Sequence, residues 1–281
     1  MHEIALWQAL VLGVVEGITE FLPVSSTGHL TIVEQLMGIP IDNKAVTAYT
    51  AIIQVGAIAA AVIYFWRDIV RIVVAFFRGL LSAEARTTAD WRLAIAVVVG
   101  SIPIAVIGLA LKDFIEGPLR SLWVVAAGLI LWSGVMVFAE SAATQQRREA
   151  NVKLKDGLII GLVQCFALIP GVSRSGATIS AGLLRDFNRV TATRLAFFLG
   201  IPALTAAGGL EAVTAASDIS STVGWAATAV GTVVSFVVAY VSIAWLLRFV
   251  SHNSIAWFVW YRVGLGVLLI IGLYTGVLSA T

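Results

Sequence analysis

The sequence predicts an all-α polytopic membrane protein with six transmembrane helices and two re-entrant helical hairpins. The chain has 281 residues, of which 59% are hydrophobic and only 12% are charged, and its mean hydropathy is +0.97. Such a composition is too apolar for a surface in water, so we expect the solvent to be a bilayer. The formal net charge is +2 and the basic residues are spread along the chain, which argues against a nucleic-acid-binding protein.

Six stretches are long and apolar enough to span a bilayer, which takes about 20 mostly apolar residues. In chain order they are roughly residues 45–65, 92–111, 121–140, 194–213, 224–247 and 255–278. We expect each stretch to form one transmembrane helix. Arg262 lies about two turns inside the last stretch, and we expect its side chain to extend to the cytoplasmic interface.

Two more apolar stretches, about 5–38 and 156–186, are interrupted by FLPVSSTGH and LIPGVSRSG. Proline, glycine and serine at these points would leave backbone groups without hydrogen bonds in lipid, so each stretch predicts a re-entrant helix-turn-helix hairpin. Irregular backbone persists at membrane depth only inside protein or beside a water-filled cavity. The two turns are therefore the first place to look for a functional site.

The two hairpins align with each other, which predicts an internal repeat. Each half would hold one hairpin followed by three spanning helices, so the second half would enter the membrane from the opposite face. We expect a single integral-membrane domain over residues 1–281 that contains two inverted repeats, about 1–140 and 156–281. A constant offset pairs Gly13 with Gly161, Val24 with Val172, Ser25 with Ser173, Ser26 with Arg174 and Gly28 with Gly176.

Basic residues gather on one face of this topology, and the positive-inside rule makes that face cytoplasmic. Both termini would then lie outside, and the two hairpin turns would meet near the midplane. The outer face has only Lys44, Lys112 and Arg120. The cytoplasmic face has Arg67, Arg71, Arg78, Arg86, Arg92, Arg147, Arg148, Lys153, Lys155, Arg185, Arg189, Arg194 and Arg248.

Glu16 and Glu20 are four residues apart, so both carboxylates lie on one face of the first hairpin helix. A carboxylate at membrane depth is costly unless it is paired, protonated or bound to a cation, so the pair indicates a functional site. For either residue alone, hydrogen bonds to amides of the hairpin itself are an equally good interpretation.

The turn PVSSTGH follows these glutamates, and Ser25, Ser26 or Thr27 can cap the helix after it. A hydroxyl beside a helix N-terminus and a base such as Glu20 suits a nucleophile that attacks a bound phosphate. The alternative is a serine that only caps the helix. For His29, a general acid or nucleophile and a structural hydrogen-bonding role both remain open.

The second turn, PGVSRSGATIS, places Arg174 between two serines and two glycines. A guanidinium binds phosphoryl oxygens in a bidentate manner, and glycines let backbone amides approach a ligand closely. Arg174 is therefore a candidate phosphate clamp. The alternative is that it only neutralises Glu16 or Glu20, because a buried arginine needs a counter-charge.

At this point two segments, EGITEFLPVSSTGH (16–29) and PGVSRSGATIS (170–180), resemble the signature segments of the undecaprenyl-diphosphate phosphatase family, also called bacitracin-resistance proteins. The resemblance extends over nearly the whole chain. It implies hydrolysis of undecaprenyl diphosphate to the monophosphate and inorganic phosphate, which recycles the lipid carrier of cell-wall synthesis. The expected location is the bacterial plasma membrane, with the site opening to the outer face. A homodimer is left open.

The resemblance also implies a role for each residue of the site. Glu16 and Glu20 would be the acidic pair, Ser26 the nucleophile, Arg174 the diphosphate clamp and His29 a further participant in catalysis. A divalent cation, Mg²⁺ or Ca²⁺, would bind near Glu16 and Glu20, in part through the substrate diphosphate. Further contacts to the long prenyl diphosphate are expected from Ser25, Thr27, Gly28, Gly171, Ser173, Ser175, Gly176 and Thr178.

Only one catalytic site is expected, because the second hairpin has Gln164 and Leu168 where the first has Glu16 and Glu20. The main alternative function is a transporter or lipid flippase, since inverted repeats with broken helices are common in transporters. The fold alone does not separate the two functions. Phosphate release by the detergent-solubilised protein would favour the enzyme.

Overall fold

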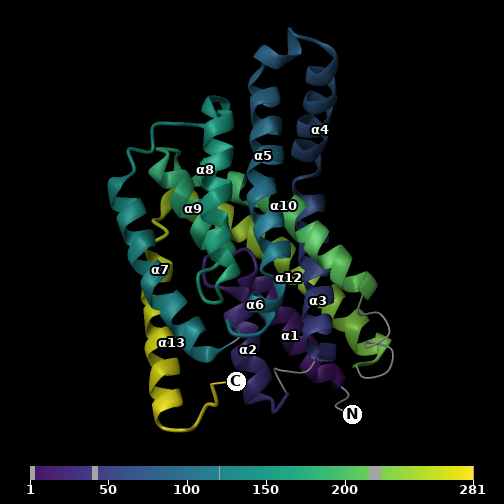
Figure 1. Cartoon of the computed structure of the whole chain (residues 1–281), viewed down its shortest axis with the longest axis vertical. Coiled ribbons are helices and arrows are strands. Elements are labelled where there is room, and N and C mark those ends of the chain that lie inside the picture. The colour runs from purple at the N-terminus through teal and green to yellow at the C-terminus, as the bar shows by residue number, and fades with distance from the viewer. Residues whose placement is uncertain (1–3, 40–43, 120, 215–222, 281) are drawn as a thin grey trace.

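The computed structural model describes residues 4–39, 44–119, 121–214 and 223–280. Within these ranges the chain is helical and forms no β-strand, as Figure 1 shows. The helices are α1 (Leu6–Thr19), α2 (Ser26–Leu36), α3 (Lys44–Tyr64), α4 (Trp66–Leu81), α5 (Ala89–Ala110), α6 (Lys112–Glu116), α7 (Leu122–Ala142), α8 (Leu154–Gln164), α9 (Arg174–Leu184), α10 (Arg189–Thr214), α12 (Trp225–His252) and α13 (Trp257–Tyr274). Short 3₁₀ turns are η1 (Ala85–Thr87), η2 (Glu149–Asn151) and η3 (Cys165–Leu168). The predicted all-helical fold class is confirmed.

Five helices in the described part of the chain are long and apolar enough to cross a membrane: α3, α5, α7, α12 and α13. They coincide with five of the six stretches predicted to span. The remaining stretch, 194–213, lies inside α10, which has 26 residues and an internal proline, Pro202. That helix begins at Arg189 and so includes two arginines in its first two turns. The chain is therefore a multi-pass membrane protein.

The connection between the first two predicted spans contains structure that the sequence reading did not assign. Residues 66–81 form α4, which stands beside the first half of α5 as an antiparallel pair at one end of the molecule (Figure 1). One face of α4 exposes large apolar side chains, among them Trp66 and Phe77, while Gly79 packs against the Trp91 ring. An amphipathic pattern of this kind suits the boundary between lipid and water.

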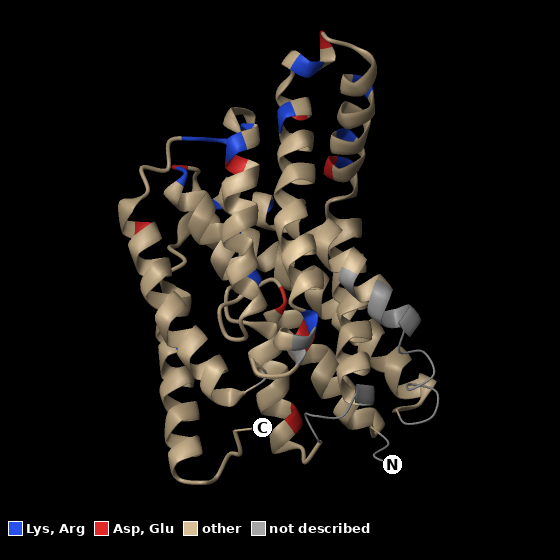
Figure 2. Cartoon of the chain, in the orientation of Figure 1, with Lys and Arg blue, Asp and Glu red and all other residues tan. Residues whose placement is uncertain are grey.

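An ion-pair network joins α4 to its neighbours at this end of the molecule. Arg71 contacts Asp68 of the same helix, Asp90 of α5 and Glu149 of η2, at N···O distances of 3.0, 2.9 and 2.6 Å. Arg194 of α10 contacts Asp68 and Glu149, each at 2.9 Å. Figure 2 shows that Lys and Arg concentrate at this end, around α4 and the first turns of α5 and α8. Of the residues counted for the outer face, Arg120 and the side chain of Lys44 lie outside the description.

The hairpin helices cross their partners at glycines. In α1, a Cβ on Gly13 would come within 2.6 Å of the Gly231 carbonyl oxygen of α12, and Gly17 lies as close to Ser235 of the same helix. In α8, Gly157 and Gly161 lie equally close to the backbone of α5. Small residues four apart let two helix backbones approach closely in a membrane, where apolar surface alone does not drive association. The sequences GVVEG and GLIIG thus fix where each hairpin sits.

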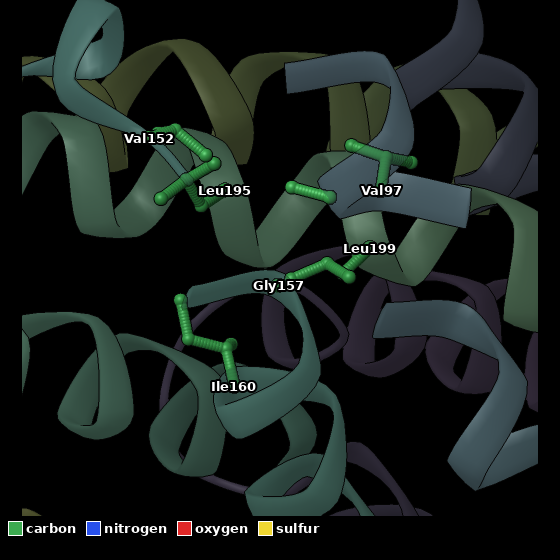
Figure 3. Close-up of a pocket in the computed structure, with 7 residues that line it drawn as sticks. Val97, Val152, Gly157, Ile160, Leu195 and Leu199 are labelled. Atoms are coloured by element: carbon green, nitrogen blue, oxygen red, sulfur yellow. The ribbon is translucent and has the colours of Figure 1, made fainter. Parts of the chain in front are cut away.

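Apolar side chains fill the junction of α5, α8 and α10. Figure 3 shows Val97 and Leu199 on one side of this junction and Val152, Ile160 and Leu195 around it. These residues belong to the largest buried cluster, which continues through Phe65, Phe197 and Phe198. The packing holds α8 in place, and its residues carry no group suited to chemistry.

Asp156 anchors the first turn of α8 to the loops at the basic end. Its side chain is 1% exposed and accepts hydrogen bonds from Arg147 at 2.5 and 3.0 Å, from Arg185 at 2.9 Å and from the Lys153 amide at 2.9 Å. Burial alone would raise the pKa of this carboxyl group, but the hydrogen bonds from Arg147, Arg185 and Lys153 hold it below the ordinary aspartate value.

We expect Asp156→Asn to lower the free energy of unfolding at neutral pH by about 2 kcal/mol, because two guanidinium groups lose their charge partner. The folded-state pKa of Asp156 is depressed, so its stabilisation is present above the unfolded-state pKa and is lost as the pH falls through the folded-state value. Thermal unfolding in detergent from pH 7 to pH 3 should show the difference between wild type and variant shrinking at the acid end.

Asp90→Asn is the matched control, because Asp90 is about two-fifths exposed and its partner Arg71 keeps two other carboxylates. It should change stability by less than about 1 kcal/mol. A difference between wild type and Asp156→Asn that stays constant down to pH 3 would show that the charge of Asp156 is not what stabilises this end of the fold.

Candidate active site

Both hairpin helices break where proline, glycine and serine predicted a break. After Thr19 the chain makes a non-helical turn and becomes helical again at Ser26, the first residue of α2. In the second hairpin, α8 and η3 are followed by a turn at Ile169–Ser173 before α9 begins at Arg174. Ser25 and Ser173, the last residues of the two turns, are both buried, so their polar groups need partners within the protein.

Ser25 and Ser173 have the same backbone and the same cap. Their φ angles are +77° and +75°, in the left-handed region that non-glycine residues avoid, at a cost of about 1–3 kcal/mol each. Each side-chain oxygen accepts a hydrogen bond from the amide three residues on, Gly28 at 3.4 Å and Gly176 at 3.2 Å. Of the three hydroxyl residues that could cap α2, Ser25 therefore does so, which leaves Ser26 in the first turn of the helix.

The two turns contact each other directly. The Gly171 amide donates to the Ser25 side-chain oxygen at 3.2 Å, and the Ser175 hydroxyl donates to the Leu22 carbonyl at 2.9 Å. Gly171 has a φ of +92°, and a Cβ there would overlap the Val125 carbonyl of α7 at 2.2 Å. Glycine is thus required for the turn to lie against α7, rather than for the approach of a ligand. The prediction that the two turns meet is confirmed.

Three polar side chains form a continuous chain at this junction. The Ser26 hydroxyl donates to Glu20 Oε2 at 2.6 Å, and Arg174 Nη2 donates to Glu20 Oε1 at 3.1 Å. Glu20 is 5% exposed, and the Arg174 side chain is 12% exposed. The arrangement joins a hydroxyl to a carboxylate that can accept its proton, next to a guanidinium that can bind an anion.

Gly200 of α10 makes room for the Arg174 side chain, and sequence reasoning missed it. A Cβ at Gly200 would lie 1.5 Å from Arg174 Nη1, which excludes any larger residue while the arginine keeps this position. The Arg174 Nε is buried and has no hydrogen-bond partner among the described residues. The guanidinium thus has a donor to spare beside the ion pair with Glu20.

A cavity of about 600 Å³ opens beside this chain of side chains. Its size is in the range of small-molecule sites. The polar part of its lining comes from the hairpin turns and the helix ends beside them: Glu20, Ser25, Ser26, Thr27, Ser173 and Arg174. Gln54 of α3 also borders the cavity. The rest of the lining is apolar apart from Lys112, and comes from α5, α6, η3, the second turn and α10: Ile104, Ala105, Gly108, Leu109, Ile115, Ala167, Leu168, Pro170, Ala203, Leu204 and Ala206. One cavity therefore combines polar groups with an apolar wall.

Several predicted site residues lie behind this lining. Gly28, Gly171, Ser175, Gly176 and Thr178 do not border the cavity. The Thr178 hydroxyl donates to the Arg174 carbonyl within α9, and Gly28 packs against Val125. These residues hold the two turns in shape and position the residues in front of them.

Glu16 is 1% exposed and also lies behind the lining. Its carboxyl group interacts with the Glu20 carboxyl group and with the Arg174 guanidinium, while its Oε1 has no hydrogen-bond partner among the described residues. Among those residues no group of three or more histidine, cysteine or acidic side chains is placed to hold a metal ion. A protein-only metal site is therefore not formed here. A cation shared between one or two carboxylates and a diphosphate would fit, since Mg²⁺ commonly binds in this way.

His29 is held on both sides of its ring. Its Nδ1 lies 2.7 Å from the Ser25 carbonyl oxygen, which can only accept, so Nδ1 carries the hydrogen. Its Nε2 lies 2.6 Å from the Tyr261 hydroxyl oxygen. The His29 ring also stacks on the Tyr261 ring, with 5.5 Å between the ring centroids. Both nitrogen atoms are thus occupied, and His29 does not border the cavity. This geometry favours the structural interpretation over a nucleophile or general acid.

We expect His29→Asn to keep most of any activity of this site, whereas His29→Ala should lower it about tenfold. The asparagine amide can replace the Nδ1–H that donates to the Ser25 carbonyl, so the strained serine stays in place. Initial rates and thermal unfolding of both variants check this. Equal inactivity of the two variants, with normal folding, would instead assign the imidazole a direct part in the chemistry. Tyr261→Phe is a further control and should cost only about 1 kcal/mol of stability.

Arg262 does not extend to the cytoplasmic interface, and that prediction is wrong. Its side chain is fully buried, and Nη1 donates to the Pro23 carbonyl at 2.9 Å. Nη2 lies 2.9 and 3.1 Å from the carbonyl oxygens of Gly171 and Val172, and Nε donates to the Ser133 hydroxyl at 3.1 Å. The turns have carbonyl groups that no helix satisfies, and this one guanidinium supplies donors to both turns.

Comparison with known proteins identifies relatives over nearly the whole chain. A sequence model of the family described as "Bacitracin resistance protein BacA" matches residues 9–268. A protein of Cutibacterium acnes named undecaprenyl-diphosphatase is 58% identical over 272 residues, which cover 94% of this chain and 95% of the relative. Another from Frankia casuarinae, named undecaprenyl-diphosphatase 3, is 56% identical over 274 residues, or 98% of this chain and 99% of the relative. A Mycobacterium relative named undecaprenyl-diphosphatase is 47% identical over 277 residues, 97% of this chain and 98% of its own.

Proposed function

The chain belongs to the bacitracin resistance protein BacA family, and from this premise we propose that it hydrolyses undecaprenyl diphosphate to undecaprenyl phosphate and inorganic phosphate. The protein is an integral-membrane phosphatase that returns the lipid carrier of cell-wall synthesis to its monophosphate form, which confers resistance to bacitracin. The observation that carries the proposal at the atomic level is the contact of Ser26, Glu20 and Arg174 at one end of the 600 Å³ cavity.

Ser26 is the nucleophile in this proposal. Its hydroxyl oxygen attacks the terminal phosphorus while its proton passes to Glu20 Oε2, which already accepts that hydrogen at 2.6 Å. The bond between the terminal phosphorus and the bridging oxygen breaks, and the electron pair stays on the phosphate of the lipid. Water then attacks the phosphoserine and releases inorganic phosphate. In the variant mechanism, the same groups activate water directly and no phosphoserine forms.

Arg174 changes partner when the substrate binds. In the structure it shares charge with Glu20, but its unpartnered Nε and its two terminal nitrogens form a fork that fits the oxygens of a phosphoryl group. A phosphate there competes with Glu20 for the guanidinium, and the carboxylate is then released to accept the Ser26 proton. Binding of the substrate phosphate and activation of the Ser26 hydroxyl then occur together.

A divalent cation, Mg²⁺ or Ca²⁺, completes the site in the proposal. Glu16 Oε1, which lacks a partner among the described residues, and Glu20 are the oxygen ligands that the chain offers, and the substrate diphosphate supplies the others. When bound, such a cation neutralises negative charge on the phosphoryl oxygens.

The hairpins are re-entrant in this proposal, and the two halves of the chain are inverted repeats with α10 as the sixth spanning helix. Three pairs of features support it: the left-handed Ser25 and Ser173, the turn contacts between hairpins, and the crossings of α1 on α12 and of α8 on α5. The basic end is cytoplasmic by the positive-inside rule, so the termini face outward, and in this proposal the cavity opens to the same side. Whether two copies associate is a separate matter that the site does not require.

A transporter or flippase is the alternative from another class, because broken helices that meet inside a membrane are also a transporter plan. Phosphate release from a long prenyl diphosphate by the purified protein in detergent, with and without a chelator, tests the proposal. We expect release that stops when the chelator removes the cation. Protein that is folded and cation-loaded but releases no phosphate would refute the phosphatase and point to transport.

A further inference from the structure

Among the residues that the structure describes, two cationic ones border the cavity: Arg174 at the hairpin turns and Lys112 at the start of α6. Lys112 follows α5 after a single residue, Leu111, whose amide bonds the Ile107 carbonyl and whose carbonyl accepts from the Ile115 amide. Ile104, Gly108 and Lys112 are spaced by four residues and all border the cavity. They therefore form one strip of its wall, about 12 Å long, with an ammonium group at its end.

Arg174 is only partly available to bind phosphate, because it already forms an ion pair with Glu20. Glu20 takes one side of its guanidinium, at 3.1 Å. A phosphate monoester carries a charge of about −1.5 to −2 near neutral pH, and a diphosphate ester has a second phosphate to neutralise. Lys112 adds a positive charge on a flexible stem, which can follow a phosphate as it moves.

We propose that Lys112 is a substrate-binding residue whose ammonium group contacts the phosphate that remains on the lipid. This inference rests on the proposed phosphatase function and assigns a second phosphate position within the same cavity. The terminal phosphate occupies the position at Ser26 and Arg174, because the reacting hydroxyl lies there.

The lipid-attached phosphate lies between the terminal phosphate and the prenyl chain. The apolar residues of α5, η3 and α10, such as Leu109, Leu168 and Leu204, form the wall that suits the chain. Lys112 borders the cavity just beyond the end of α5, so the proposal places the lipid-attached phosphate beside it, between the head group and the first isoprene units. Lys112 and Arg174 are the cationic side chains among the described lining residues, and Arg174 serves the terminal phosphate.

A cation at this position acts on the bond that breaks. As the terminal phosphorus leaves, negative charge grows on the bridging oxygen of the lipid phosphate, and the ammonium group stabilises that charge. The same contact holds the monophosphate product. Lys112 should therefore affect both the rate of cleavage and the affinity for the lipid product, but not the affinity for inorganic phosphate, which binds at Arg174.

The test compares wild type with Lys112→Met, Lys112→Gln and Lys112→Arg in detergent. Three quantities are measured: kcat/KM for farnesyl diphosphate, the inhibition constant of farnesyl phosphate, and that of inorganic phosphate. We expect Lys112→Met and Lys112→Gln to lower kcat/KM by about 10–100-fold and to raise the inhibition constant of farnesyl phosphate by at least about tenfold. Inorganic phosphate should inhibit within twofold of wild type, and Lys112→Arg should recover most of both losses.

Lys155→Met is the matched control, because Lys155 is exposed on α8 and does not border the cavity. It should leave all three quantities unchanged. The proposal is overturned if farnesyl phosphate inhibits Lys112→Met as it inhibits wild type, if both inhibition constants rise equally, or if Lys155→Met has the same effect. A lysine that only stabilises the carboxyl end of α5 would change the melting temperature and leave the inhibition constants unchanged.

The outcome is separable from that of the phosphatase proposal. If the wild-type protein releases no phosphate, the proposed phosphatase function is refuted, but the proposed role of Lys112 is not. Calorimetric binding of farnesyl phosphate to wild type and to Lys112→Met then still decides the role of Lys112. Weaker binding by the variant, of about tenfold or more, supports it, and equal binding overturns it.

Discussion

Ser26→Ala is expected to lower kcat for phosphate release by about 1,000-fold or more, with the protein folded as wild type. The Ser26 hydroxyl is the hydroxyl group that hydrogen-bonds to Glu20 at the edge of the cavity, and it lies in the first turn of α2 without capping the helix. Removing it should therefore cost activity and little stability. Colorimetric phosphate release and thermal unfolding measure the two effects.

Glu20→Gln and the double variant Ser26→Ala/Glu20→Gln sharpen this prediction. If hydroxyl and carboxylate act as one unit, the double variant should be about as slow as either single variant, because each change alone already removes proton transfer. If the loss of rate in the double variant were instead the product of the losses in the two single variants, Ser26 and Glu20 would not act in the same step. Ser251→Ala, which changes an exposed serine that bonds only to its own helix end and His252, is the control and should match wild type. Substantial activity in Ser26→Ala would favour direct attack by water.

The hairpin turns could be predicted from sequence because their chemistry is local. A cluster of proline, glycine and serine in an apolar stretch favours a break in the helix, and an acidic pair four residues apart shares a face in any helix. The repeat offset then brought Ser26 and Arg174 to corresponding positions, and the structure joins them through Glu20. Local rules and one symmetry argument were sufficient for this part of the site.

Other parts of the site depend on tertiary contacts that no local pattern reveals. Gly200 lies in an ordinary apolar helix, and its role follows only from the position of the Arg174 guanidinium. Lys112 reads as a charge at a helix end until the cavity shows which space it borders. His29 had two interpretations because its ring has two nitrogen atoms, and their partners, Ser25 and Tyr261, come from distant segments.

Arg262 is the clearest failure of sequence reasoning, and its reason is physical. An arginine near aromatic residues and a helix end usually extends its head group to water. Here the two turns have backbone carbonyl groups in the protein interior that no helix satisfies. The planar Arg262 guanidinium donates to several of them, and the free energy gained outweighs the loss of hydration of its charge. The need for a donor arises from segments far away in the sequence.

Arg262→Met is accordingly expected to have the largest effect on stability, a loss of roughly 3–5 kcal/mol in the free energy of unfolding. The methionine fills much of the volume but leaves the carbonyl oxygens of Pro23, Gly171 and Val172 without their donor. Thermal unfolding and gel filtration in detergent should show a less stable protein that aggregates more readily. Arg174→Met should abolish phosphate release while lowering stability less than Arg262→Met does, because its guanidinium serves the ligand and pairs with Glu20 but does not hold the turns together.

Arg262→Lys separates the charge from the shape of the side chain. An ammonium group keeps the positive charge but cannot reach both turns with a planar fork, so we expect partial folding and a rate lowered by about tenfold or more. Arg248→Lys, on the exposed surface of α12, should leave stability and rate unchanged. If Arg262→Lys matched wild type in both, the charge alone would be sufficient, and the turns would owe their positions to the contacts of Ser25 with Gly171 and of Ser175 with Leu22.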